Sequence, residues 1–145
     1  MKKSGKANVV MLGGLLGVFL IIGLAFFSGE SASVAATRFM SALASRDIDT
    51  LTATSYIEKA TPDEIRKEWE YCIKVANPNY AFEWNVLGEV QPDDKSASVR
   101  LDIKRESNGP ASYFEKFGLP LVKIDNKWLV DVRSIDRDMY PFLPR

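Results

Sequence analysis

The sequence predicts an α+β domain that follows an N-terminal transmembrane helix. Three observations lead to this prediction: an apolar run without charges near the N-terminus, a helical period of apolar residues after it, and alternation of apolar and polar residues in the second half. Because the helices precede the strands, we expect helices packed on one face of a curved antiparallel sheet of about four strands.

Residues 9–27 form the apolar run, and residues 7–29 carry no charge. A helix of about 20 apolar residues crosses the hydrocarbon core of a bilayer. Lys2, Lys3 and Lys6 precede the run, and positive charge favours the cytoplasmic side. We therefore expect residues 1–8 to be a cytoplasmic basic tail, residues 9–27 a single-pass anchor in a bacterial inner (plasma) membrane, and residues 28–33 a linker. Residues 34–136 would then form a periplasmic or extracellular domain.

A cleaved signal peptide is the alternative for the same run. The run is longer than the usual apolar region of a signal peptide, and Gly29-Glu30-Ser31 follows it instead of a small-x-small cleavage site. The sequence therefore favours an uncleaved anchor. Gly13 and Gly17 are spaced as in helix-packing faces of membrane helices, although glycine is also common in such helices without that role.

Composition excludes several classes of function. Outside the basic tail the chain has more acidic than basic residues, so nucleic acid is not an expected partner. Cys72 is the single cysteine, which rules out an intrachain disulfide. Histidine is absent, and with it the commonest general base and metal ligand. We expect no metal site and no cofactor.

Two helical regions are predicted after the linker. In residues 34–51 the apolar side chains fall on one face, with a break near Arg46-Asp47. The second region begins at Thr61-Pro62-Asp63-Glu64, where Thr61 is a suitable N-cap and Glu64 can complete a capping box. It ends at Asn77-Pro78-Asn79. The apolar stripe of this helix includes Cys72, which we interpret as a buried structural thiol.

Four strands are predicted from the two-residue period. They cover residues 80–86, 99–104, 113–125 and 128–132, and we expect the third to be bent or bulged at Gly118-Leu119-Pro120. Residues 137–145 have no periodicity and are predicted to form an extended tail. Its apolar side chains are candidates for contact with the domain or a partner: Met139, Tyr140, Phe142 and Leu143.

Two segments resemble a known family. The stretch VAATRFMSALASRDIDTL at residues 34–51 is similar to the first helix of the nuclear transport factor 2-like (NTF2-like, cystatin-like) superfamily. The stretch LVKIDNKWLVDV at residues 121–132 resembles its closing hairpin. The resemblance implies a cone formed by a curved sheet around helices, often with a pocket at its mouth. It implies little about activity, because this fold carries isomerases, cyclases, transport factors and scaffolds.

The resemblance leaves an isomerase-like or cyclase-like enzyme as one hypothesis. Such members need an acid or base that faces the pocket, commonly with tyrosine partners. The sequence offers acids and tyrosines, but most of the acids fall at turns or on the polar side of strands, where a solvated charge explains them. We assign no catalytic residue. The candidates considered are Asp47, Asp49, Glu83, Asp102 and Asp131, with Tyr56, Tyr80 and Tyr113.

A binding module is a second hypothesis, because the domain is rich in large aromatic side chains. Core packing explains most of them, but an incompletely filled cone would use the remainder to line a pocket for a small hydrophobic molecule. The possible lining residues are Phe39, Trp69, Tyr80, Phe82, Trp84 and Trp128.

The interpretation that we favour is a non-catalytic accessory or scaffold subunit. It would bind other subunits of a membrane complex through its transmembrane helix and its exoplasmic domain. The layout resembles the bitopic scaffold of type IV secretion systems, and also a small peripheral subunit of an electron-transfer complex.

Overall fold

The structure is a computed structural model that describes residues 29–105 and 113–145. The predicted tail of residues 1–8 and the predicted transmembrane helix of residues 9–27, with Gly13 and Gly17, lie outside these ranges. Within the ranges described, no helix is long and apolar enough to cross a membrane. Ser31–Arg145 forms one compact unit.

The helical half confirms the predicted break and the predicted helix start. Helix α2 (Ala32–Ser45) ends at Arg46, and α3 (Ile48–Thr54) begins after Asp47, whose carboxylate accepts a hydrogen bond from the Thr50 amide. Helix α4 (Pro62–Glu70) starts with a complete capping box between Thr61 and Glu64. These caps explain the helix boundaries because they satisfy amides that have no partner within the helix.

Helix α4 continues directly into a π-helix, η1 (Tyr71–Ala76), which the sequence did not predict. A π-helix has a wider turn than an α-helix, so the side chains of Tyr71–Ala76 are rotated relative to the α-helical register. Cys72 and Ile73 remain buried, whereas Tyr71 and Val75 are exposed. The predicted stop at Asn77 is confirmed.

In the part of the chain that the structure describes, the sheet has five strands in the order β1-β5-β4-β3-β2. Its strands are β1 (Ser55–Tyr56), β2 (Phe82–Val90), β3 (Ser96–Arg105), β4 (Phe114–Ile124) and β5 (Lys127–Asp131). The prediction of about four antiparallel strands was wrong in one respect, because β1 pairs with β5 in parallel. A strand of two residues is too short to show a two-residue period, which explains why the sequence did not reveal it.

The irregularity of the sheet lies in β2 and not in β4. The register of β2 against β3 shifts between Val86 and Gly88, whereas β4 pairs with β3 without interruption through Gly118 and Pro120. Pro120 is tolerated because pairing between β4 and β5 begins only at Leu121. Of the predicted bend or bulge at Gly118-Leu119-Pro120, the bulge is therefore wrong.

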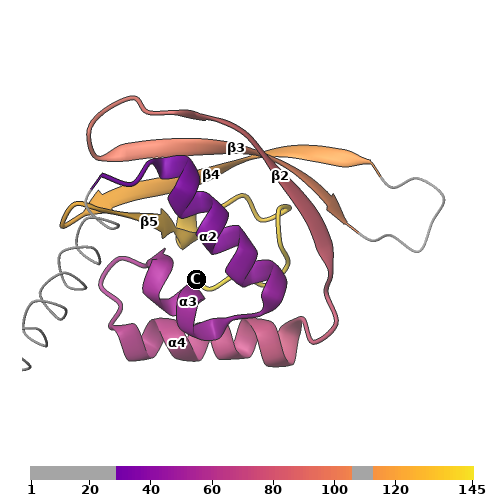
Figure 1. The fold of residues 1–145 in the computed structure, drawn as a ribbon. Helices are drawn as coiled ribbons and strands as arrows, with labels where there is room; N and C mark the ends of the chain where they lie inside the picture. Colours follow the sequence, from indigo (N-terminus) through magenta and orange to yellow (C-terminus); the bar gives the residue numbers. More distant parts are fainter. Residues whose placement is uncertain (1–28, 106–112) are drawn as a thin grey trace, which may run out of the picture. The chain divides into compact units, whose positions relative to one another are not determined.

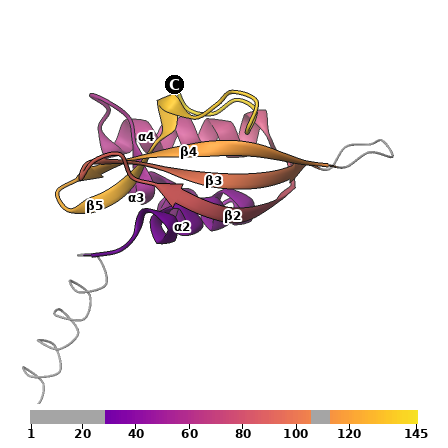
Figure 2. The same ribbon diagram turned by 90° about the horizontal axis from the view of Figure 1, so that it is seen from above.

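Helix α2 contacts β2, β3, β4 and β5 and thus covers the inner face of the sheet (Figure 1). In the view from above, α2 and α4 are seen on opposite sides of the strands, and the end of the chain lies nearer to α4 (Figure 2). The core lies between the sheet and the helices and includes fully buried side chains from both. They include Phe39, Met40, Leu43, Trp69, Leu101, Ile103 and Leu119.

The end of the chain belongs to this core. After the 3-10 turn η2 (Val132–Ser134), residues 137–142 form successive turns, in contrast to the predicted extended tail. Met139, Tyr140 and Leu143 are buried, while Phe142 is 66% exposed. The apolar residues of the tail therefore have two different roles, and only Phe142 of these four projects to solvent.

Candidate functional site

Three of the six predicted pocket residues pack in the core. Phe39 and Trp69 are fully buried, with ring centroids 5.8 Å apart in an edge-to-face contact. The Trp69 indole donates a hydrogen bond to Ser55 Oγ at 2.9 Å, which joins α4 to β1. Trp128 is also buried, and Lys123 Nζ lies 5.3 Å from the centre of its ring. These side chains stabilise the fold instead of presenting a surface to a ligand.

The structure brings Tyr80 and Phe82 together with Tyr140 of the tail. The Tyr140 ring makes edge contacts with Tyr80 at 4.8 Å and with Phe82 at 5.8 Å, measured between ring centroids. Tyr140 is itself buried, so these three rings pack together at this end of the sheet. The last of the six, Trp84, is partly buried and packs against the core from β2.

A polar group lies at the same end of the sheet. Arg105 Nη2 donates to Glu115 Oε2 at 2.9 Å, and the Arg105 guanidinium lies 5.7 Å from the centre of the Phe117 ring. Burial raises the pKa of Tyr80, and the positive charge of Arg105 opposes that shift. Among the described residues, Tyr80 Oη and Arg105 Nε are buried without a hydrogen-bond partner.

The acids considered for catalysis mostly have structural partners. Asp47 caps α3, Asp49 pairs with Arg66, and the Glu83 carboxylate lies 3.6 Å from Lys104 Nζ. Asp131 accepts a hydrogen bond from Ser134 Oγ at 2.7 Å. Hydrogen bonds from Thr50 lower the pKa of Asp47, so it stays ionised and is unsuited to act as a base near neutral pH.

Asp102 and the two other tyrosines complete the list of candidates. Asp102 Oδ1 is buried without a partner among the described residues, on the β3 face opposite to Leu101 and Ile103. Tyr56 is half-buried in β1, and Tyr113 is 67% exposed. The predicted acids and tyrosines therefore lie in different parts of the domain, apart from Tyr80 in the group already described.

Cys72 is a structural thiol, as predicted. It is fully buried, and burial raises its pKa to about 11, although a hydrogen bond from Asn77 Nδ2 at 3.7 Å opposes the shift. A thiol with this pKa is protonated at neutral pH, so it is a poor nucleophile. Within residues 29–105 and 113–145, no three acidic or cysteine side chains are grouped as a metal site.

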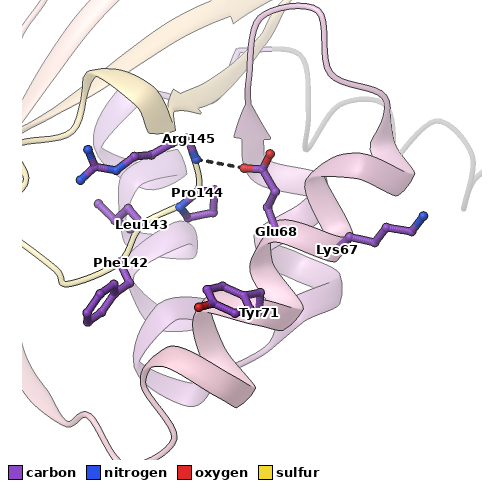
Figure 3. Close-up of a pocket in the computed structure, with 7 residues that line it drawn as sticks. All are labelled: Lys67, Glu68, Tyr71, Phe142, Leu143, Pro144 and Arg145. Atoms are coloured by element: carbon purple, nitrogen blue, oxygen red, sulfur yellow. Dashed lines mark hydrogen bonds between the residues drawn. The ribbon is translucent and has the colours of Figure 1, made fainter.

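A hollow lies between α4 and the end of the chain, and we call it the α4 groove (Figure 3). It has a volume of about 420 Å³. Four of its lining side chains are aromatic or aliphatic and three are charged: Tyr71, Phe142, Leu143 and Pro144, with Lys67, Glu68 and Arg145. Such a lining is typical of a site that binds an apolar group and orients it by a few polar contacts.

Two exposed aromatic rings flank the α4 groove. Tyr71 is 60% and Phe142 66% exposed, and Val75, which follows Tyr71 in η1, is 64% exposed. Phe142 has a φ of 58°, in the left-handed region. A residue with a side chain pays about 1–2 kcal/mol for this conformation. The chain thus adopts an unfavourable backbone conformation at the residue whose ring projects to solvent.

A hydrogen bond fixes the polar side of the α4 groove. The Arg145 amide donates to Glu68 Oε2 at 3.0 Å, and in Figure 3 the Arg145 guanidinium points away from Glu68. This bond ties the last residues to α4 and satisfies the Glu68 carboxylate. Lys67 remains as a charged side chain on the opposite part of the lining.

Sequence reasoning identified Phe142 and Leu143 of this site and missed the others. Tyr71 gave one signal that could have been used, since it is a large aromatic residue next to the apolar stripe and not on it. The sequence contains no such signal for Lys67, Glu68, Pro144 and Arg145, because these residues come together only when the tail returns to α4.

Comparisons with known proteins give no family by sequence. No family model matches the chain, and no curated protein matches it significantly. Among solved structures it is similar to an NTF2-like protein of unknown function from Shewanella oneidensis, with 12% identity, a TM-score of 0.48, and coverage of 68% of this chain and 89% of the other. It is also similar to a proposed calcium/calmodulin-dependent protein kinase type II association domain from Thiobacillus denitrificans, with 12% identity, a TM-score of 0.48, and coverage of 68% of this chain and 87% of the other.

A ketosteroid isomerase-like protein from Erwinia carotovora atroseptica is also similar, with 16% identity, a TM-score of 0.46, and coverage of 68% of this chain and 86% of the other. These identities and TM-scores are too low to support an inference about activity, ligand or partners.

Proposed function

We propose that this chain is a non-catalytic accessory subunit of a membrane complex and that its domain binds a partner protein through the α4 groove. The observation that carries the proposal is the pair of exposed rings, Tyr71 and Phe142, on either side of an apolar hollow. Exposed aromatic side chains next to a hollow are typical of interface hot spots.

The shape of the surface favours a protein over a small hydrophobic molecule. Val75 follows Tyr71 in η1 and is 64% exposed, but it is not part of the lining of the α4 groove. A small molecule in the hollow would leave this apolar side chain exposed, whereas a protein segment could cover it as well. Two of the residues predicted to line a pocket in the cone, Tyr80 and Phe82, pack against Tyr140.

The backbone of Phe142 supports the same proposal. Strained conformations persist where the surrounding structure enforces them, and they are frequent at binding sites. The neighbouring residues Tyr140 and Leu143 are buried on both sides of Phe142. Their burial holds the turn in place, and the turn directs the Phe142 ring to solvent.

The membrane anchor and the family relation are further parts of the proposal. Residues 9–27 would span a bacterial inner membrane, because they are apolar, uncharged and preceded by lysines. The partner would then be another subunit of a secretion-type or electron-transfer complex. Relation to the NTF2-like superfamily is supported by the order of helices before strands and by a bulged β2 that bends around α2 (Figure 1).

The test is co-purification of the full chain from its native membrane in mild detergent. We expect a defined larger complex with the native chain and its loss with Phe142→Asn, because asparagine tolerates the left-handed conformation but removes the ring. The free energy of unfolding should change by less than about 0.5 kcal/mol, since the ring is mainly exposed. Migration of the native chain alone would contradict the proposal.

Tyr113→Asn is the matched control. Tyr113 is as exposed as Phe142 but belongs to the segment before β4, and it does not line the α4 groove. We expect this variant to retain the complex. Equal loss with both variants would show that exposed aromatic residues act non-specifically, and the assignment of the α4 groove would then be wrong.

A further inference from the structure

A second hollow shares one wall with the α4 groove, and we call it the arginine hollow. It has a volume of about 200 Å³ and is lined by Arg133, Arg137 and Arg145. Its other lining residues are Val132, Ile135, Leu143 and Pro144, so no acidic side chain is among them. Leu143, Pro144 and Arg145 line both hollows.

The main chain fixes the positions of the three arginines. Arg133 lies within η2, next to the buried Val132, and Arg137 lies in a turn closed by the Met139 amide and the Asp136 carbonyl at 3.1 Å. The Arg145 amide is held by Glu68. The three side chains therefore begin from fixed points around one hollow, as required of a site that is formed before its ligand arrives.

Their guanidinium groups are almost free of partners within the part of the chain that the structure describes. Arg133 Nη1 donates to the Glu58 carbonyl at 3.5 Å, at the limit for a hydrogen bond, and the side chains of Arg137 and Arg145 have no hydrogen bond or ion pair there. Asp131 and Asp136 are close to these arginines in sequence, but neither lines the hollow; Asp131 accepts a hydrogen bond from Ser134 and Asp136 accepts one from the Asp138 amide. Like charges repel, so three positively charged side chains around one hollow favour an anion between them.

We infer that the arginine hollow binds a carboxylate of the same partner segment that places an apolar side chain in the α4 groove. This inference rests on the proposed function and adds the chemistry of the partner, an apolar residue followed closely by an acidic one. A guanidinium group donates two parallel hydrogen bonds to a carboxylate, which provides direction as well as charge. The shared wall of Leu143, Pro144 and Arg145 lies between the two subsites.

A peptide fits this arrangement better than the surface of an anionic membrane. A membrane surface is broad and is contacted by charges that project from a protein, whereas these three arginines line a hollow. Side chains of a peptide can enter hollows on both sides of a narrow wall. We therefore assign the site to an acidic segment of a partner protein.

The experiment uses the full chain in nanodiscs and two small probes, 4-phenylbutyrate and the neutral 4-phenylbutanol. Signals of the arginine side-chain N–H groups and of the Tyr71 and Phe142 rings are followed by NMR during titration. We expect both probes to shift the ring signals, and the acid to bind about ten-fold more tightly, as for a charge-assisted hydrogen bond. The acid alone should shift the signals of Arg133 and Arg137.

The variant Arg133→Gln/Arg137→Gln should lose the preference for the acid and keep the affinity for the alcohol. Arg100→Gln/Lys116→Gln removes two positive charges from exposed positions on β3 and β4 and should retain the preference. Equal affinity for the two probes in the native chain would overturn the inference and leave the α4 groove proposal intact. If neither probe shifts the ring signals, both the inference and the proposed groove are wrong.

Vesicles test the alternative source of the anion. The native chain in detergent is mixed with vesicles of phosphatidylcholine, with or without phosphatidylglycerol. Binding that requires phosphatidylglycerol, Arg133 and Arg137, together with equal affinity for the two small probes, would assign the arginines to a membrane and overturn the peptide assignment. If the double variant and the native chain bind the vesicles equally, the result would support the assignment of the arginines to a peptide.

Discussion

Arg46 caps the C-terminal ends of two helical segments, α2 with its backbone amide and η1 with its guanidinium group. Its φ is 62°, and its amide donates to the carbonyls of Ala42 and Leu43 at the end of α2. Its guanidinium donates to the carbonyl of Ile73 within η1 and to those of Asn77 and Pro78 after it. Glycine is the usual residue in this conformation, but it could not supply the second set of contacts. The side chain thus compensates for the unfavourable backbone.

Cys72 gives a prediction for alkaline stability. Its folded pKa of about 11 lies above the ordinary value of 9.0 because burial disfavours the thiolate. The unfolded chain therefore loses this proton first, so the stability present below pH 9 declines as the pH rises from 9 through 11. Burial also raises the pKa of Tyr140, which acts in the same direction.

Urea unfolding of the native chain and of Cys72→Ala at pH 7 and pH 10.5 measures this effect. Between these values we expect the native chain to lose roughly 1–2 kcal/mol more than the variant, although the variant is less stable at both because of its cavity. The same pH dependence in both proteins would show that Cys72 ionises in the folded state as easily as in the unfolded chain.

The start of α2 depends on the bulge in β2, which places Glu89 on the inner face of the sheet. Glu89 pairs in register with Val99, a buried residue, because one extra residue lies between Val86 and Gly88. From there the Glu89 carboxylate accepts from the amide and the hydroxyl of Ser33, both at 2.7 Å. A negative charge at this end of a helix is stabilising.

We predict that Glu89→Ala lowers the free energy of unfolding by about 1 kcal/mol, because the amide and the hydroxyl of Ser33 both lose their charged acceptor. Thermal unfolding with circular dichroism provides the measurement. Glu83→Ala is the control, since Glu83 makes only an exposed ion pair with Lys104 and should matter by less than about 0.5 kcal/mol. Equal effects of the two substitutions would argue against a capping role for Glu89.

The elements that the sequence predicted are those with a local signal. The capping box at Thr61 and Glu64, the break at Arg46-Asp47 and the alternation in β3 each depend on residues close together in the chain. The bulge in β2 and the pairing of β1 with β5 have no such signal. They depend on which side chain must face a distant element, and a sequence alone does not provide that information.

At the scale of the whole molecule, Tyr140 joins the end of the chain to the core, where its ring contacts Tyr80 and Phe82. We predict that Tyr140→Ala lowers stability by about 3–4 kcal/mol, as expected for a buried aromatic ring, whereas Tyr140→Phe has a much smaller effect. The alanine variant should also bind a hydrophobic dye while it retains its far-ultraviolet circular dichroism, because the space beside Tyr80 and Phe82 opens. Unchanged dye binding by a folded Tyr140→Ala chain would show that the surrounding side chains collapse into the space.

The candidate site also shows the limit of prediction at this scale. The aromatic residues predicted to line a pocket are mainly core residues, because sequence alone does not distinguish a filled cone from an open one. The α4 groove forms where the tail returns to a helix that lies far earlier in the chain. Only Phe142 and Leu143 were recognised, from their apolar character in a segment without periodicity.

The parallel pair β1–β5 has a consequence for the order in which the domain folds. The antiparallel strands β2 to β5 join neighbours in the chain, so their loops close at low entropic cost. Ser55 meets Val130 only after most of the intervening chain has been arranged. Contacts between distant residues slow folding, so we expect the strands β2 to β5 to assemble early and β1 to dock late. The helical half and the sheet would then join into one core in the final, rate-limiting step.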